Sequence, residues 1–431
     1  MHLQTQESPT REVNKMNQEP ETQQLSKAEM AQYEKVIPMW KIVFTQFKEH
    51  RMAMIGLIVI SLFATIAISA DLISKITGLD PQVQNPLNRY SGVMTESYQS
   101  HEIREERLQK FIDKNPDMSR LIATNLNEIL IHETATVVDP TEIRTEDQSG
   151  VVDPNQSLFN LVAKDREEAF QILGKINVAG KDEFEKLFNG FVKTHVFGTD
   201  ELGRDVLIRL IYGTRVSMGV GLLVALSSAL IGLLIGSMAG FYGGTLDALL
   251  MRLTDALLAL PILPIQIIIA AVDLNKLPFI KSMVGAQSEN IVKLVFILVM
   301  FSWMTTALLV RGAILSLRER EFILAARTLG ATDRMIIVRH LFPNVMAPLL
   351  VSVTLGVGES ILFEAALSFL GLGIQQPTPS WGNMLFNAQD LITEAPFLAI
   401  LPGLLILATT ISFNYLGDGL QDAIDPKAVR R

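Results

Sequence analysis

Uncharged stretches long enough to cross a bilayer recur along this chain. There are six: residues 52–70, 216–245, 256–272, 294–310, 345–371, which carries two glutamates, and 395–417. A helix spans the hydrocarbon core with about 20 mainly apolar residues, so the pattern predicts six transmembrane helices. Any single run of 17 residues could instead be a buried helix of a soluble core, but six runs together favour the membrane. The predicted fold class is an all-α polytopic membrane protein.

A long polar stretch separates the first two spans. It contains apolar residues at helical spacing, namely Leu158, Leu161 and Val162, followed by Phe170, Leu173 and Ile176. A structureless loop of this length is improbable in a folded protein. We therefore expect residues 81–194 to form a small, mostly helical insertion; the alternative is a disordered tether.

The remaining chain divides around these elements. Residues 1–40 are polar and rich in Gln, Glu and Lys, which predicts a disordered tail without a cleavable signal peptide. Residues 41–80 hold the first span with its flanks, and residues 195–431 form a core with spans two to six. The loop at 311–344 carries six arginines, whereas the next loop carries no Lys or Arg. Basic loops face the cytoplasm, so both termini and this loop are predicted to be cytoplasmic and the insertion extracytoplasmic, in a multi-pass protein of the cell membrane.

Composition narrows the function. The 431 residues are 49% hydrophobic and only 19% charged, with a net charge of −8, which disfavours a soluble enzyme and a nucleic-acid partner. There is no cysteine, the six histidines all lie outside the predicted spans, and no phosphate-binding G-x-x-x-x-G-K-[ST] loop is present. An intramembrane zinc protease would lack its ligands. We therefore predict no catalytic residue, metal site or bound cofactor, and any ATP would be hydrolysed by another chain.

Ionisable residues inside membrane helices are candidates for function. Asp255 stands at the entry to the third span, and Glu359 and Glu364 lie within the fifth. At 100° per residue these two glutamates are about 140° apart on the helix, so they do not form one paired site. One is expected to face a water-filled translocation path and the other a neighbouring helix, and the sequence leaves open which of the two faces the path; the alternative for Glu359 is an internal hydrogen bond.

Two further features concern helix packing. Gly232, Gly236 and Gly240 recur at a spacing of four residues in the second span, which lets a neighbouring helix approach closely. Pro261 and Pro264 in the third span free backbone carbonyls and predict a kink.

The 311–344 loop reads as two short helices. Gly330 permits a left-handed turn after the first helix, and Thr332 is a candidate N-cap for the second, which Asp333 begins. Pro343 introduces the fifth span. Ala325 and Ala326 leave room on the first helix for a partner surface.

The motif A-A-x-x-x-G followed by L-x-P in this loop resembles the "EAA" coupling loop of permeases from binding-protein-dependent ABC importers. A second segment resembles the H-x-x-G-T-D-x-x-G-R-D signature of the C-type permease subunit of dipeptide, oligopeptide and nickel importers. Its matching residues are His195, Gly198, Thr199, Asp200, Gly203, Arg204 and Asp205. The resemblance covers roughly residues 38–80 and 194–431.

The resemblance implies a membrane subunit that pairs with a homologous B-type permease to form the translocation path. Two cytoplasmic ATPases, which hold ATP and Mg, would dock on the coupling loops, and an extracytoplasmic binding protein would deliver a peptide for alternating access. The ATPase-coupling residues implied here are Glu321, Leu324, Ala325, Ala326, Gly330, Asp333 and Pro343.

The sequence departs from the family pattern in three places. Leu324 stands where the motif usually has glutamate, and Glu321, on the same helix face, is the candidate substitute. Glu359 replaces a small or apolar residue, and compact family members lack the insertion. The insertion would dock the binding protein, cover the entrance of the translocation path, or only pack on the sister permease.

Two alternative interpretations come from other classes. A polytopic membrane enzyme would carry a catalytic dyad, and an ion-driven transporter would carry internal repeats. Within the family the cargo stays open between oligopeptide, dipeptide, nickel chelate and a sugar-like solute.

Overall fold

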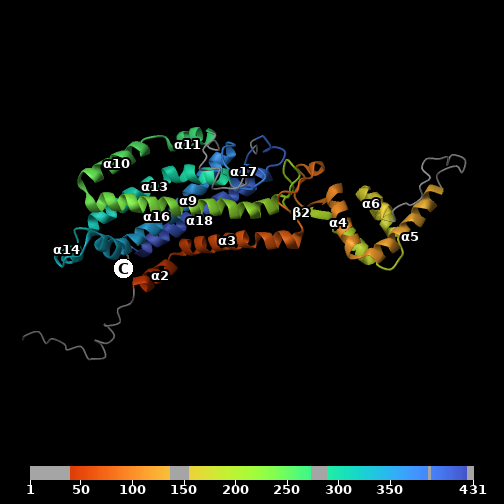
Figure 1. The fold of residues 1–431 in the computed structure, drawn as a ribbon, viewed down its shortest axis with the longest axis horizontal. Helices are drawn as coiled ribbons and strands as arrows, with labels where there is room; N and C mark the ends of the chain where they lie inside the picture. Colours follow the sequence, from red (N-terminus) through yellow and green to blue (C-terminus); the bar gives the residue numbers. More distant parts are fainter. Residues whose placement is uncertain (1–38, 136–154, 273–288, 387–389, 425–431) are drawn as a thin grey trace, which may run out of the picture.

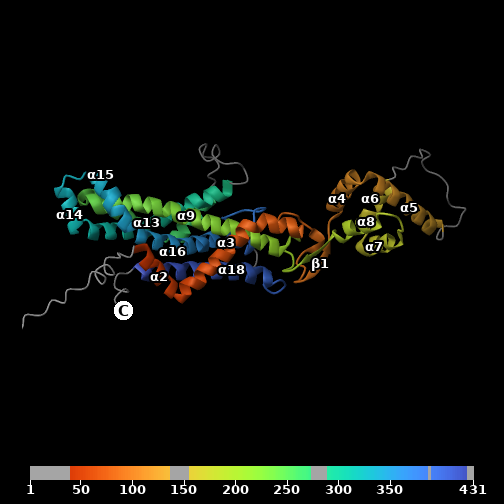
Figure 2. The same ribbon diagram turned by 90° about the horizontal axis from the view of Figure 1, so that it is seen from below.

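The computed structural model describes residues 39–135, 155–272, 289–386 and 390–424. The molecule is elongated and has two parts: a bundle of long helices and a separate helical subdomain at one end (Figure 1). The short helix α14 (Glu321–Thr328) lies at the opposite end of the bundle, as both views show (Figure 2). The predicted disordered tail lies almost entirely outside the described residues.

Within the described ranges, five helices are long and apolar enough to cross a membrane. They are α3 (Arg51–Thr77), α9 (Val206–Tyr242), α13 (Glu289–Leu317), α16 (Phe342–Phe369) and α18 (Phe397–Ile424). A sixth crossing is made if the pair α10 (Gly244–Leu258) and α11 (Ile262–Ala271) counts as one span, bent by 82° at its break. This agrees with the predicted all-α polytopic fold.

The third predicted span, residues 256–272, is broken into parts of two helices, α10 and α11. Pro261 stands in the break as the N-cap of α11, with an extended backbone (φ −68°, ψ 102°). Proline disfavours helical geometry at the residue before it, so the helix stops ahead of Leu260. The kink itself was predicted; its position splits the span, and α10 begins twelve residues before the predicted start.

The glycines of α9 pack directly against α13, as their spacing predicts. A Cβ on Gly236 would lie 2.5 Å from the carbonyl oxygen of Ala307, and one on Gly232 would lie 2.8 Å from that of Trp303. Gly240 faces Ile314 in the same way. No side chain fits at these positions, so the two backbones lie in close contact.

The insertion folds around its own core. Its helices are α4 (His101–Lys114), α5 (Pro116–Ala135), α6 (Gln156–Ala163), α7 (Arg166–Lys175) and α8 (Lys181–Asn189). Leu158, Leu161 and Val162 are buried with Leu173 and Ile176, so the predicted amphipathic helices are present and the tether alternative is wrong for the described part of the segment. Three phenylalanines from the end of the insertion complete this core: Phe184, Phe188 and Phe191.

A two-stranded sheet, not predicted from the sequence, joins the subdomain to the bundle. β1 (Thr95–Tyr98) pairs antiparallel with β2 (Val192–His195), with Tyr98 opposite Val192. The chain therefore enters and leaves the helical subdomain at adjacent points. The remaining short elements are α2 (Met39–Glu49), η1 (Pro86–Asn88), α15 (Asp333–Met335), the π-helical turn η3 (Ile336–Leu341) and α17 (Trp381–Met384).

Candidate functional site

The loop between α13 and α16 has the predicted local structure. Gly330 adopts the left-handed conformation, with φ +83°, and ends the turn after α14. Thr332 caps α15 by accepting a hydrogen bond from the backbone N–H of Met335 at 3.4 Å. Pro343 lies in the first turn of α16, where proline is tolerated because its nitrogen needs no partner.

The outer face of α14 is apolar and exposed. Ile323 is fully buried and anchors the helix, whereas Phe322, Leu324 and Leu329 are 44%, 51% and 88% exposed. We call Phe322, Leu324, Ala325 and Leu329 the coupling surface; Ala325 is also exposed. Several large exposed apolar side chains on one short helix are typical of an interaction surface.

The polar members of the predicted coupling set flank this patch. Glu321 at the start of α14 and Asp333 at the start of α15 are both exposed, and Ala326 is half-buried. Leu324 lies one helical turn from Glu321, so the leucine and the carboxylate share a face of α14.

The signature residues form a buried ionic network at the other end of the bundle. Asp200 Oδ2 accepts a hydrogen bond from Arg204 Nε at 2.7 Å and lies 3.3 Å from Arg209 Nε. Its Oδ1 accepts the backbone N–H groups of Leu202 and Arg204 at 2.9 and 3.0 Å. Both guanidinium groups are only 2% exposed, so this carboxylate lies beside two buried cations. Arg204 has a second acidic partner, because its Nη2 donates to Glu201 Oε1 at 3.2 Å.

The signature glycines hold the segment that precedes the hairpin. Gly203 has φ +70°, and a Cβ there would lie 1.8 Å from the carbonyl oxygen of Asn85. Gly198 has φ +73°, and its Cβ would lie 2.2 Å from that of Ser91. Thr199 accepts a hydrogen bond from the Ser91 N–H at 2.9 Å and donates to the carbonyl oxygen of Asn88. Only glycine, which has no Cβ, lets the backbone at positions 198 and 203 lie this close to the backbone of Ser91 and Asn85.

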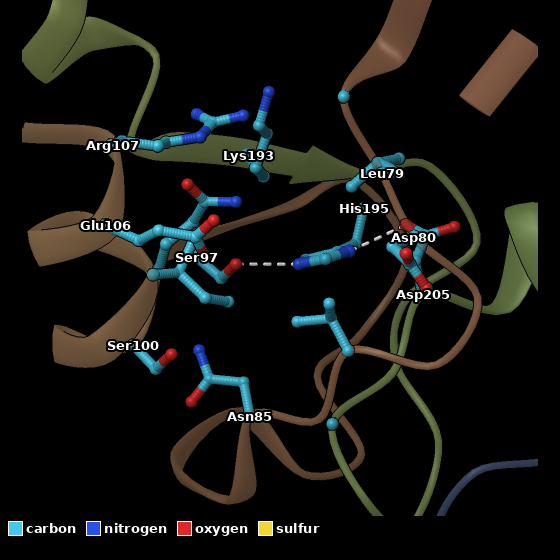
Figure 3. A pocket seen from close by; sticks show the side chains of 15 residues that line it. Leu79, Asp80, Asn85, Ser97, Ser100, Glu106, Arg107, Lys193, His195 and Asp205 are labelled. Carbon is cyan, nitrogen blue, oxygen red and sulfur yellow. Dashed lines mark hydrogen bonds and ion pairs between the residues drawn. The ribbon is translucent and has the colours of Figure 1, made fainter. Parts of the chain in front are cut away.

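His195 links the hairpin to the membrane helix (Figure 3). Its Nδ1 lies 2.6 Å from Asp205 Oδ2, and its Nε2 lies 2.7 Å from Ser97 Oγ. A carboxylate only accepts, so Nδ1 donates, and Nε2 of a neutral ring accepts from the serine hydroxyl. Asp205 also caps α9 by accepting from the Ile208 N–H at 2.8 Å. The order Ser–His–Asp is that of hydrolase triads, but all three side chains are over nine-tenths buried, and we assign them to fixing the hairpin on α9.

Sequence reasoning missed the partners of the signature. Three residues contact the signature although each lies 98 or more residues away from its partner in the chain: Ser97, Asn85 and Gln376. Gln376 accepts a hydrogen bond from Arg204 Nη1 at 2.9 Å. No local pattern marks these three residues, because each acts through a long-range contact.

The three candidate path residues lie in different surroundings. Glu364 is fully buried; its carboxylate accepts hydrogen bonds from Ser368 at 2.8 Å and from Ser217 of α9 at 3.1 Å. Glu359 is exposed on α16, and Asp255 is exposed on α10. The structure thus separates the two glutamates, as their helical spacing predicts. Within the described ranges, no group of three His, Cys, Asp or Glu side chains could hold a metal ion.

These features define a multi-pass helical membrane protein with an exposed apolar loop at one end and a buried signature network at the other. Residues 232–430 match the family described as "Binding-protein-dependent transport system inner membrane component", and residues 38–91 match the "N-terminal TM domain of oligopeptide transport permease C". The chain belongs to this family of transport permeases.

Curated relatives agree over the membrane part. The dipeptide transport system permease DppC of Alkalihalophilus pseudofirmus is 40% identical over 233 residues, which are 54% of this chain and 72% of that protein. The glutathione transport system permease GsiD of Escherichia coli O157:H7 is 40% identical over 245 residues, 57% of this chain and 76% of the relative. The oligopeptide transport system permease OppC of Bacillus subtilis is 38% identical over 235 residues, 54% of this chain and 72% of the relative.

Proposed function

We propose that this chain is a transmembrane permease subunit of an ATP-driven peptide importer. The names of the three relatives, a dipeptide, a glutathione and an oligopeptide permease, support a peptide cargo. In this proposal the chain forms the translocation path with a homologous B-type permease and binds no cofactor. Two ATPase chains hold ATP and Mg, and an extracytoplasmic binding protein delivers the substrate.

The coupling surface is the observation that carries this proposal. It lies at an end of the molecule, on a short helix held between α13 and α16 (Figure 1). The surface would insert into a groove of the ATPase, with Glu321 supplying the carboxylate that Leu324 lacks. Closure of the two ATPases around ATP would then displace α14 and, through α13 and α16, the bundle, producing alternating access.

The substitution Ala326→Arg tests the docking. It places a long charged side chain beside the coupling surface, and we expect loss of ATPase co-purification and of transport, while the subunit still inserts. Ala326→Ser, which keeps the residue small, is the matched control and should retain both. Wild-type transport by Ala326→Arg would contradict the docking assignment.

The translocation path would run along the exposed face of α16. Glu359 and Leu362, about one helical turn apart, are both exposed on this face, and a sister permease would cover it. A charged side chain among apolar ones at this depth is a candidate to line a watery path. The buried hydrogen bonds of Glu364 support an internal role for that residue. Asp255, exposed on α10, would lie near the cytoplasmic entry.

The helical subdomain would face the binding protein. It lies at the end of the bundle opposite the coupling surface (Figure 2), so the two would project from opposite sides of the cell membrane, the loop and both termini in the cytoplasm. Residues 71–209 hold 24 Asp/Glu against 16 Lys/Arg, a net charge of −8. Such a surface would steer a partner with a basic patch, and the attraction would weaken as salt rises.

The hairpin allows a clean deletion to test this role. The N–H of Gln99 donates to the carbonyl oxygen of Phe191 at 2.9 Å, so a short Gly-containing turn can join these residues in place of 100–190. We expect assembly with the sister permease and the ATPases to persist, with weaker binding-protein affinity and reduced transport. Wild-type affinity and transport by the deleted complex would exclude both docking and covering roles and leave only packing on the sister permease.

Transport assays with the reconstituted complex would separate the cargo classes. Uptake of a labelled oligopeptide should be inhibited by unlabelled peptides and not by a nickel chelate or a sugar. Inhibition by the chelate alone would favour the nickel alternative.

A further inference from the structure

A cavity of about 230 Å³ lies where the end of α3, the hairpin and α4 meet. Figure 3 shows its side chains, with Arg107 of α4 and Lys193 of β2 on one side and Ser97, His195 and Asp205 on the other. The first two are not used by the coupling surface or by the signature network.

The acidic and the basic side chains of this cavity differ in the polar partners that they have. Asp205 bonds His195, Glu106 pairs with Lys110 at 2.5 Å, and Asp80 accepts the Gln82 N–H at 2.7 Å. In contrast, Arg107 Nη1 donates only to the carbonyl oxygen of Gly190 at 2.9 Å, and Lys193 Nζ to that of Thr77 at 3.1 Å. In the part of the chain that the structure describes, neither cation is in an ion pair.

The two cations converge on one point. The position that a Cβ on Gly78 would take lies 2.7 Å from Lys193 Nζ and 3.5 Å from Arg107 Nη2. Gly78, with φ +65°, has no side chain, and a Cβ at this point would collide with Lys193 Nζ. An anionic oxygen near it would come within reach of both groups. Partial burial and the Arg107 charge lower the pKa of Lys193, so a bound anion would relieve the repulsion between the two cations.

The depth of this point in the membrane indicates which kind of anion the two cations bind. The 27 residues of α3 extend about 40 Å, longer than the roughly 30 Å hydrocarbon core. Gly78, directly after the helix, therefore lies at headgroup depth. Ile68, Leu72 and Ile76, one turn apart, are 81%, 59% and 76% exposed along α3 up to this level, a surface that suits acyl chains.

We propose that Arg107 and Lys193 bind the phosphate of an anionic phospholipid, with its acyl chains against Ile68, Leu72 and Ile76 of α3. The lipid would thus rest at the joint between the membrane bundle and the helical subdomain. This site is independent of the cargo and of the orientation of the chain, because both leaflets contain phospholipid headgroups.

The test is native mass spectrometry of the full chain titrated with phosphatidylglycerol, phosphatidylcholine or inorganic phosphate. A basic residue near a membrane surface strengthens anionic lipid binding by about fivefold, so Arg107→Gln with Lys193→Gln should weaken phosphatidylglycerol binding by about thirtyfold. Lys114→Gln with Arg120→Gln removes the same charge from exposed positions of the subdomain and should change it little. Lys193→Arg should retain binding.

Each other outcome overturns a defined part of the proposal. Equal binding of the two lipids excludes selection of an anionic lipid, and full competition by inorganic phosphate excludes the acyl contribution. Unchanged phosphatidylglycerol binding by the double variant excludes the site. If the double variant does not assemble, Lys193→Gln alone, with an expected loss of about fivefold, decides the same question.

Discussion

Asp200→Asn should destabilise the protein far more than its small size change suggests. The carboxylate is an acidic partner of both Arg204 and Arg209, whose guanidinium groups are 2% exposed. Arg204 keeps Glu201 as a second partner at 3.2 Å, so the loss falls chiefly on Arg209. An asparagine keeps an oxygen for the backbone N–H groups of Leu202 and Arg204. Its amide N–H group, however, would point at two buried cations.

The magnitude follows from the burial of the network. Breaking a buried ion pair by removing one partner costs about 3–5 kcal/mol, since the other charge stays buried without compensation. Asp71→Asn is the matched control: it removes the same charge from a pair with Arg215 in which Asp71 is 62% exposed. Exposed pairs contribute only about 0–1 kcal/mol.

The measurement is unfolding of the purified chain in mixed micelles by increasing denaturant, followed by tryptophan fluorescence. Trp381 is fully buried and packs on Phe63 with ring centroids 6.1 Å apart, so its emission reports loss of the bundle. We expect a clearly lower midpoint for Asp200→Asn and little change for Asp71→Asn. Equal midpoints for the two variants would refute the claim that Asp200 stabilises the buried guanidinium groups beside it.

Three further outcomes follow from the proposed function. Gly330→Ala forces a side chain into φ +83° with open space around it, which costs about 1–2 kcal/mol locally, so transport should fall. The control Gly312→Ala, in a helix with equal space, should transport normally. Equal transport by the two variants would contradict a role for the left-handed turn at Gly330. Since the chain has no cysteine, an impermeant thiol reagent should label Gln171→Cys from outside and Thr328→Cys only from inside; the reverse pattern would invert the topology. Glu359→Gln should change uptake without changing ATPase co-purification, and unaltered uptake would remove this residue from the path.

The spans were predictable because hydropathy acts through the local sequence. The break at Pro261 was predictable only in part. The proline indicates a kink, but hydropathy placed the start of the span after Asp255, whereas α10 begins earlier in the chain. The helix α10 tolerates Asp247 because this carboxylate pairs with Arg311 Nε at 2.5 Å. That contact joins residues far apart in the chain, so no local pattern reveals it.

The signature was found as a motif, yet its physical role depends on the folded chain. The sequence shows glycines at 198 and 203, whereas the reason for them is the backbone of Asn85 and Ser91 beside them. The hairpin was missed because strands of four residues carry too little pattern. Its register, with Thr95 opposite His195, is what brings Ser97 to the signature histidine.

The glycine contacts between α9 and α13 have a thermodynamic consequence. Helix α9 begins at the Asp205 cap and runs for 37 residues, about 55 Å, while α13 leads into α14. Backbones locked at Gly232, Gly236 and Gly240 leave little freedom for one helix to slide on the other. If the pair moves as one rigid body, a ligand at either end biases the same two-state equilibrium, and the coupling free energy is reciprocal. Under the proposed function, any factor by which ATP on the ATPases changes the affinity of the subdomain for the binding protein is then the factor by which the bound binding protein changes the affinity for ATP.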